Sequence, residues 1–114
     1  MRTIIAGSRH LWIDVDTIDI IVNSFQLHIS KIVSGHSGNV DLAAESWAKR
    51  EGIPCELYPA DWKQFGRRAG PLRNGTMVKN ADALIAVHDG ISRGTADVIR
   101  QAREAGLKVF VWTH

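Results

Sequence analysis

Apolar positions along the chain follow two different patterns. Short segments rich in apolar residues, which are typical of strands, occupy residues 3–6, 31–33, 53–58, 83–87 and 108–112, and residues 83–87 form an uninterrupted apolar run. Apolar residues spaced by three or four positions, which are typical of amphipathic helices, occupy residues 18–25, 40–48 and 98–105. Pro71 opens a further helix that runs to about residue 80, because a first helical turn tolerates proline. The pattern therefore predicts strands that alternate with helices along the chain.

This alternation predicts an α/β fold, because consecutive parallel strands are joined through helices by right-handed crossovers. We expect a three-layer, doubly wound parallel sheet of about five strands in the order 3-2-1-4-5, within a single domain that covers residues 1–114. Pro54 lies near the start of the third strand, and proline is confined to sheet edges and strand starts, so this strand is expected to be outermost. Residues 59–69 are expected to form an irregular surface loop.

Glycine-containing loops follow three of the predicted strands. Ligands of such sheets bind beyond the carboxyl ends of the strands where the winding direction reverses, here between the first and fourth strands. The loop after the fourth strand leads into a helix, whose N–H groups at Gly94 and Thr95 would bind a phosphate. Taken alone, this loop fits an ordinary strand-to-helix connection equally well. The three loops and the helix that begins near Pro71 supply the predicted ligand-binding residues, namely Gly7, Ser8, Arg9, Ser34, Gly35, Asp41, Arg73, Asn74, Asp89, Gly90, Ser92, Arg93, Gly94 and Thr95. Among them, Arg9 and Arg73 are expected to be exposed charged clamps.

Composition narrows the class of protein and of ligand. With 114 residues the chain buries a sizeable core without a disulfide or a metal, and its one cysteine, Cys55, is expected to be a buried structural thiol. No segment reads as a signal peptide or a membrane span, so we expect a cytoplasmic protein without a membrane partner. The formal charge is only +2 and the basic residues are mixed with acidic ones, which favours a small anionic ligand over a long polyanion.

Several kinds of chemistry have little support in the sequence. There is no Walker A lysine loop, no Gly-x-Gly-x-x-Gly after the first strand and no Gly-x-Ser-x-Gly turn, which argues against ATP hydrolysis, dinucleotide redox chemistry and serine hydrolysis. His10, His36 and His88 each follow a different predicted strand, but they lack paired metal-ligand spacing, so neither a metal nor a required cofactor is expected.

The remaining histidines and the tryptophans are expected to be structural. His28 and His114 read as surface residues. Trp62 either stacks on a base or pins its loop to the core, and pinning is favoured. The other tryptophans are Trp12, Trp47 and Trp112, and they are expected in the core or in an interface. An interface would be consistent with a homodimer.

Five pieces of the chain, taken in order, resemble the YspA-type branch of the SLOG superfamily. They are residues 7–9 (GSR), residues 34–35 (SG) with Asp41, residues 59–62 (PADW), residues 69–74 (AGPLRN) with Met77, and residues 89–95 (DGISRGT). The resemblance implies a Rossmann-like fold and a nucleotide or nucleotide-derived ligand. One branch of the superfamily, the LOG-type phosphoribohydrolases, cleaves the N-glycosidic bond of nucleoside monophosphates, but this chain keeps only the Gly-Thr end of that branch's Pro-Gly-Gly-x-Gly-Thr signature. It also has Gly38 and Asn39 where similar sequences usually have an arginine and a glycine.

These observations favour a small cytoplasmic binding or sensor domain for a nucleotide-like phosphate ligand. The first alternative is an N-glycosidase acting on nucleoside monophosphates, with Asp41, Asp89 or Asp97 as its acid or base. The second is a nucleic-acid-binding module, because the pI is about 9.0 and the superfamily includes DNA-binding relatives, although the mixed charge makes nucleic acid the less favoured partner.

Overall fold

The computed structural model describes residues 1–113, and His114, which we expected at the surface, lies outside the described residues. Five parallel strands form one sheet in the predicted order, β3-β2-β1-β4-β5, with β3 at one edge. The strands are β1 (Arg2–Gly7), β2 (Lys31–Ser34), β3 (Cys55–Leu57), β4 (Ala83–His88) and β5 (Lys108–Thr113).

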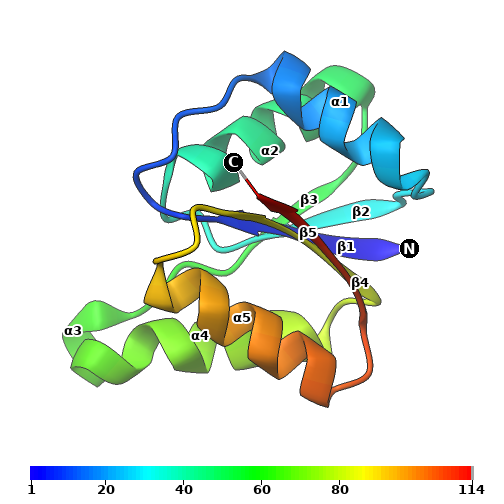
Figure 1. Ribbon diagram of the computed structural model, residues 1–114. Helices are drawn as coiled ribbons and strands as arrows, with labels where there is room; N and C mark the ends of the chain where they lie inside the picture. The colour runs from blue at the N-terminus through cyan, green and yellow to red at the C-terminus, as the bar shows by residue number, and fades with distance from the viewer. Residues whose placement is uncertain (114) are drawn as a thin grey trace.

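Helices cover both faces of this sheet and complete the predicted three-layer, Rossmann-like architecture. On one face lie α1 (Val15–Phe25) and α2 (Asn39–Glu51), and on the other lie α4 (Ala69–Lys79) and α5 (Arg93–Glu104) (Figure 1). No helix within residues 1–113 has the length and apolar character needed to cross a bilayer.

Each face of the sheet carries its own hydrophobic core, and β4 contributes to both. Residues 83–87 are inaccessible to solvent, as a strand covered on two faces requires, which explains their uninterrupted apolar run. Ile85 and Val87 pack on the side of α1 and α2 together with Trp47. Leu84 and Ala86 point the other way, toward α4 and α5.

Residues 59–69 differ from the irregular loop that we expected. Asp61 accepts a hydrogen bond from the N–H of Gln64 and so caps the one-turn helix α3 (Trp62–Phe65), which continues into the 3₁₀ turn η1 (Gly66–Arg68). None of the residues in these two turns is buried. The segment therefore extends beyond the sheet as a helical projection attached to the start of α4 (Figure 1).

The expectation that Cys55 is a buried thiol was wrong. Cys55 is exposed, because β3 is a three-residue edge strand that little of the chain covers. Trp47 is buried and Trp112 packs partly against the core, whereas Trp12 is 80% exposed in the loop before α1, so for Trp12 the interface stays a prediction. The apolar character of these residues did not distinguish core from surface.

Close packing of β1 against α2 fixes the beginning of the candidate site. A Cβ atom at Gly7 would lie 2.5–2.7 Å from three side-chain carbons of Val40, which is fully buried in the first turn of α2. Real Cβ contacts are not this short, so a larger residue at position 7 would push α2 away from the sheet.

Substituting Gly7→Ala is expected to lower the free energy of unfolding by about 1–3 kcal/mol, because overpacking a closed contact costs that much. The matched control is Gly94→Ala, where the added Cβ meets nothing within 4 Å and a helical alanine is preferred to glycine. Urea denaturation of both variants measures the difference. Equal stability would mean that α2 can move off β1 without cost.

Candidate ligand-binding cleft

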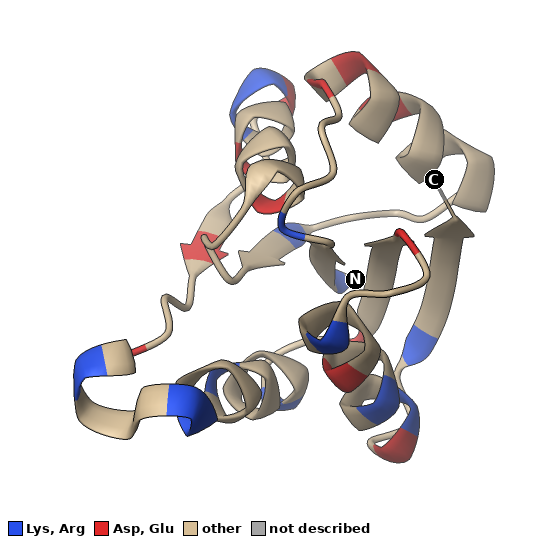
Figure 2. Cartoon of the chain, turned by 60° about the vertical axis from the view of Figure 1, so that its left-hand side comes forward, with Lys and Arg blue, Asp and Glu red and all other residues tan. Residues whose placement is uncertain are grey.

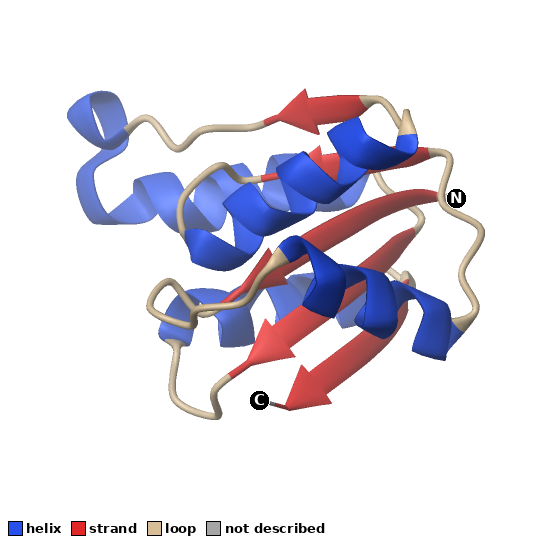
Figure 3. Cartoon of the chain, turned by 90° about the horizontal axis from the view of Figure 1, so that it is seen from above, coloured by secondary structure: helices blue, strands red, loops and turns tan. Residues whose placement is uncertain are grey.

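A cleft of about 710 Å³ opens at the carboxyl ends of the strands, between the loops that follow β1 and β4. All five strands point toward this end of the molecule (Figure 3). Most of the predicted ligand-binding residues line the cleft, namely Gly7, Arg9, Asp41, Arg73, Asn74, Asp89, Ser92, Arg93, Gly94 and Thr95. The predicted convergence of the loops is therefore present in the structure.

The other four predicted residues support the cleft without lining it. The Oγ atom of Ser8 accepts the N–H of Asp89 at 3.1 Å and so joins the loops after β1 and β4. Ser34 is buried and donates its hydroxyl to Glu45 at 2.8 Å. Gly90 lies in the left-handed region, with φ +88°, at an exposed turn. Gly35 leaves room for the guanidinium of Arg73, because a Cβ at position 35 would lie 2.5 Å from its Nη1.

The loop after β4 already contains an anion of its own. Oδ1 of Asp89 accepts the N–H groups of Ile91 and Ser92, each at 2.9 Å, and these bonds hold the pKa of Asp89 below its ordinary value. The N–H of Thr95, which we expected to face a phosphate, donates instead to Oγ of Ser92, the N-cap of α5, at 3.4 Å. Gly94 keeps a backbone N–H without a hydrogen bond to residues 1–113.

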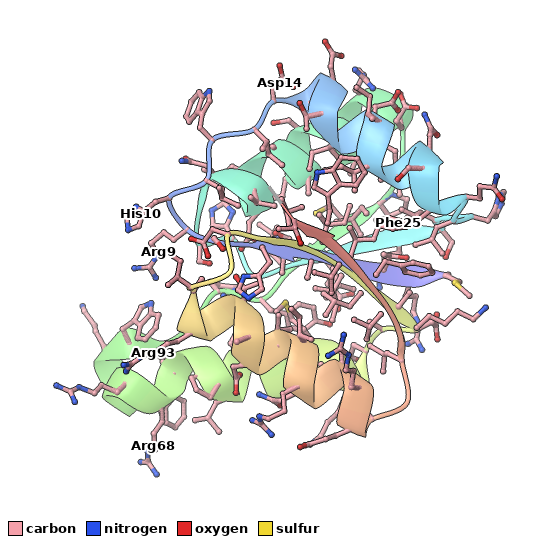
Figure 4. All side chains as sticks on the ribbon, viewed as in Figure 1. Arg9, His10, Asp14, Phe25, Arg68 and Arg93 are labelled. Atoms are coloured by element: carbon pink, nitrogen blue, oxygen red, sulfur yellow. The ribbon has the colours of Figure 1, made fainter. Side chains whose placement is uncertain are left out.

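Arginine side chains surround the cleft from several elements. Arg9 follows β1, Arg67 lies in η1 and Arg93 begins α5, and none of these three donates a side-chain hydrogen bond within the described chain. Arg9 and Arg93 lie at the same end of the molecule, whereas Arg68 points away from it (Figure 4). Acidic positions, red on the ribbon in Figure 2, occur along the same chain segments as basic ones, and Asp41, Asp89 and Asp97 line the cleft together with the arginines.

Arg73 differs from the other arginines because it is half-buried and bonded to the protein. Its Nη1 donates to the carbonyl oxygen of Gly35 at 2.6 Å, and its Nε donates to Oδ1 of Asn74 at 3.0 Å. Burial lowers the pKa of Arg73, and the charge of Asp41 opposes that shift. The expectation of an exposed clamp was therefore wrong for Arg73, since its guanidinium ties α4 to the end of β2.

The three candidate carboxylates have different surroundings. Asp97 accepts from Asn74 at 3.0 Å, from Gln101 at 2.8 Å and from Arg100 at 2.8 Å, so both of its oxygens are engaged. Asp41 is only 4% exposed, and its Oδ2 accepts both the N–H and the hydroxyl of Ser37 at 3.1 Å. Burial raises the pKa of Asp41, while the bonds from Ser37 and the charge of Arg73 lower it.

The three histidines do not meet in the cleft. His10 lines it, whereas His36 contacts Glu45 at 2.9 Å and His88 borders a separate, shallower cavity beside α5. Within residues 1–113, no group of three or more potential metal ligands comes together. The sequence placed these residues at strand ends correctly, but their side chains point in different directions.

Some residues of the cleft were not among the predicted ligand-binding residues. Trp62, for which base stacking was the less favoured reading, and Arg67 come from the helical projection that we expected to be a loop, and the exposed Ile91 lies between Asp89 and the α5 cap. Ser37, which lies just before α2, also lines the cleft. Asp61, an N-cap residue type that directly precedes α3, was the available signal for the helical projection.

The contact between Gly35 and Arg73 gives a second prediction. Removing the buried guanidinium in Arg73→Ala should lower the free energy of unfolding by about 1.5–3 kcal/mol, the range for hydrogen bonds to charged groups. A Cβ at Gly35 would lie 2.5 Å from Nη1, so Gly35→Ala should displace Arg73 and cost part of the same free energy.

The double variant completes the cycle, and urea denaturation provides all four stabilities. Once Arg73 is alanine, adding a methyl group at position 35 should cost much less than it does in the parent protein. Additive costs would show that the loop after β2 does not depend on this arginine.

Comparisons with known proteins agree with this architecture. A model of the YspA, cpYpsA-related SLOG family matches residues 1–65. The Gene 61 protein of Mycobacterium phage D29 is 38% identical over 119 aligned positions, which cover 95% of this chain and 93% of that protein. The structure of DNA processing protein A (DprA) from Streptococcus pneumoniae superposes with a TM-score of 0.75 at 18% identity, covering 96% of this chain but only 49% of that one, and this likeness shows the fold alone. The chain belongs to the YspA, cpYpsA-related SLOG family.

Proposed function

We propose that this protein is a small cytoplasmic binding or sensor domain whose cleft holds a nucleotide or a nucleotide-derived phosphate ligand. The main support is that arginine side chains from three separate elements, a free helix N–H and a buried carboxylate all line one cleft at the strand ends. This is the position at which open α/β sheets bind ligands. The volume of about 710 Å³ lies within the range for small-molecule sites.

The chemistry of the walls corresponds to the parts of a nucleotide. Arg9 and Arg93 offer charge-assisted hydrogen bonds to a phosphate, and the N–H of Gly94 offers a neutral one. Trp62 is 49% exposed at the opposite wall and Ile91 is 83% exposed at the rim, so a flat base has apolar surface to pack against. A free phosphate would leave this apolar surface uncovered.

The two alternatives receive less support. An N-glycosidase needs a carboxyl group that can give up a proton near the scissile bond. Both oxygens of Asp97 are engaged, and the bonds from Ile91 and Ser92 lower the pKa of Asp89, whereas burial raises the pKa of Asp41, which leaves Asp41 as the candidate acid. A nucleic-acid module needs a continuous row of cations along the backbone path. Here Asp41, Asp89 and Asp97 line the same cleft as the arginines, which favours one short ligand.

A nucleotide that fits the cleft should raise the melting temperature. At about 100 times its dissociation constant, a ligand that binds only the folded state adds ~2.7 kcal/mol, which is roughly ten degrees for a domain of this size. Thermal melts are measured on ligand-free protein with nucleoside mono- and diphosphates, dinucleotides, cyclic nucleotides and ADP-ribose. No shift with any of these compounds would overturn the proposal.

The same nucleoside monophosphates are also incubated with the protein and analysed by chromatography. Release of free base, together with loss of that activity in Asp41→Asn, would identify the protein as an N-glycosidase instead. A steep linear fall of log affinity for single-stranded DNA with log salt, without any nucleotide binding, would favour the nucleic-acid alternative.

The residues around the phosphate give a fourth prediction. Arg9→Ala should weaken binding of the tightest nucleotide by roughly 10- to 150-fold, the equivalent of about 1.5–3 kcal/mol, and should leave stability unchanged because the side chain is exposed. Gly94→Val should abolish binding, because its side chain would project into the open cleft.

Calorimetric titration measures both effects, and Arg103→Ala is the matched control. Arg103 is an exposed arginine near the other end of α5, where it does not line the cleft. Affinity like the parent's in Arg9→Ala and Gly94→Val would place the ligand elsewhere.

A further inference from the structure

Asp41 keeps one carboxylate oxygen without a protein partner in the wall of the cleft. Both bonds from Ser37 reach Oδ2, and no hydrogen bond from residues 1–113 reaches Oδ1. Among the side-chain nitrogen and oxygen atoms of residues 1–113, only Nδ1 of His88 is both fully enclosed and without a hydrogen-bond partner. Oδ1 of Asp41 is therefore not fully enclosed. Oδ1 therefore opens to the cleft, although the residue as a whole is 96% buried, the complement of its 4% exposure.

Once a ligand fills the cleft and excludes water, this acceptor needs a hydrogen-bond donor from the ligand, because a carboxylate oxygen buried without one loses free energy. A cationic donor is poorly suited, since Arg73 lies close enough to stabilise the charge of Asp41. The remaining donors are neutral. In a nucleotide these are the hydroxyl groups of the sugar and the amino or imino groups of the base.

The neighbours of Asp41 distinguish between these two kinds of donor. Arg73 interacts electrostatically with both Asp41 and Arg9, so the free oxygen lies on the cationic side of the cleft. Trp62, which offers apolar surface to a base, belongs to the helical projection, which also carries Arg67 but neither Arg9 nor Arg73. Because the sugar adjoins the phosphate, its hydroxyl groups reach the cationic side more readily than the base does.

We propose that Oδ1 of Asp41 accepts a hydrogen bond from a sugar hydroxyl, so that the cleft selects ribose phosphates over their deoxy forms. This inference rests on the proposed function and adds the class of sugar to it. Arg9 and Arg93 supply affinity for any phosphate, whereas Asp41 supplies selectivity, because a deoxy ligand leaves its oxygen unpaired. Ser37 fixes the carboxylate by occupying Oδ2, which keeps Oδ1 directed to the ligand.

Calorimetric titration of the unmodified protein tests this selectivity. The probes are the common ribonucleoside 5′-monophosphates, their 2′-deoxy and 3′-deoxy counterparts, and the base-free pair ribose 5-phosphate and 2-deoxyribose 5-phosphate. Loss of the contacted hydroxyl should weaken binding by roughly 10- to 100-fold, the range for one hydrogen bond to a charged group. A preference for ribose in the base-free pair, or among nucleotides that share one base, supports the proposal.

Affinities of both deoxy forms within about twofold of the ribose form would overturn the inference and leave the proposed function standing. Absence of binding by every phosphate probe would overturn both. The two failures are therefore distinguishable in a single set of titrations.

The variant Asp41→Asn examines the residue itself. The amide keeps the size of the side chain and an oxygen for Ser37, but turns an N–H₂ group toward the cleft. It should retain affinity for phosphate while its preference for ribose falls to less than about threefold. Glu51→Gln, the same chemical change at an exposed position on α2, is the matched control and should keep the full preference. An unchanged preference in a folded Asp41→Asn protein would assign the selectivity to another group.

Discussion

The pairing of β1 with β4 is the constraint on which the candidate site depends. The chain winds outward from this pair in both directions, so α2 leaves on one face of the sheet and α5 on the other. The ladder continues past the strands, because the N–H of Ser8 donates to the carbonyl of Val87 at 3.1 Å and Oγ of Ser8 accepts the N–H of Asp89. Two loops that are 81 residues apart are thereby held together at the floor of the cleft.

The sequence predicted the parts of the molecule that repeat a local pattern. The apolar run at residues 83–87 and the helical spacing predict the alternation of strands and helices, and Pro54 predicts that the third strand is outermost. The full strand order was expected because the crossover rules allow few α/β topologies and 3-2-1-4-5 is a common one. The convergence of the strand-end loops on one cleft could likewise be predicted, because the fold brings strand ends together whatever their sequence.

Features that depend on contacts between distant segments could not be predicted in this way. The burial of Arg73 follows from a bond to Gly35, which is 38 residues away, and no local pattern around either residue indicates it. Asp89, Asp41 and Asp97 read alike in the sequence, yet hydrogen bonds engage both oxygens of Asp97 and only one oxygen of each of the other two. Of these two, only Asp41 is buried. The exposure of Cys55 follows from the edge position of β3, which the apolar character of its segment conceals.

The mixture of charges in the cleft also determines how a ligand arrives. Four arginines and three aspartates line the cleft, so the formal surplus is one positive charge. They are Arg9, Arg67, Arg73 and Arg93 together with Asp41, Asp89 and Asp97. So small a surplus produces a weak field beyond the Debye length of about 8 Å at physiological ionic strength, and long-range steering contributes little. Abundant polyanions are then not drawn into the cleft from a distance. Discrimination among anions is left to contacts made after collision.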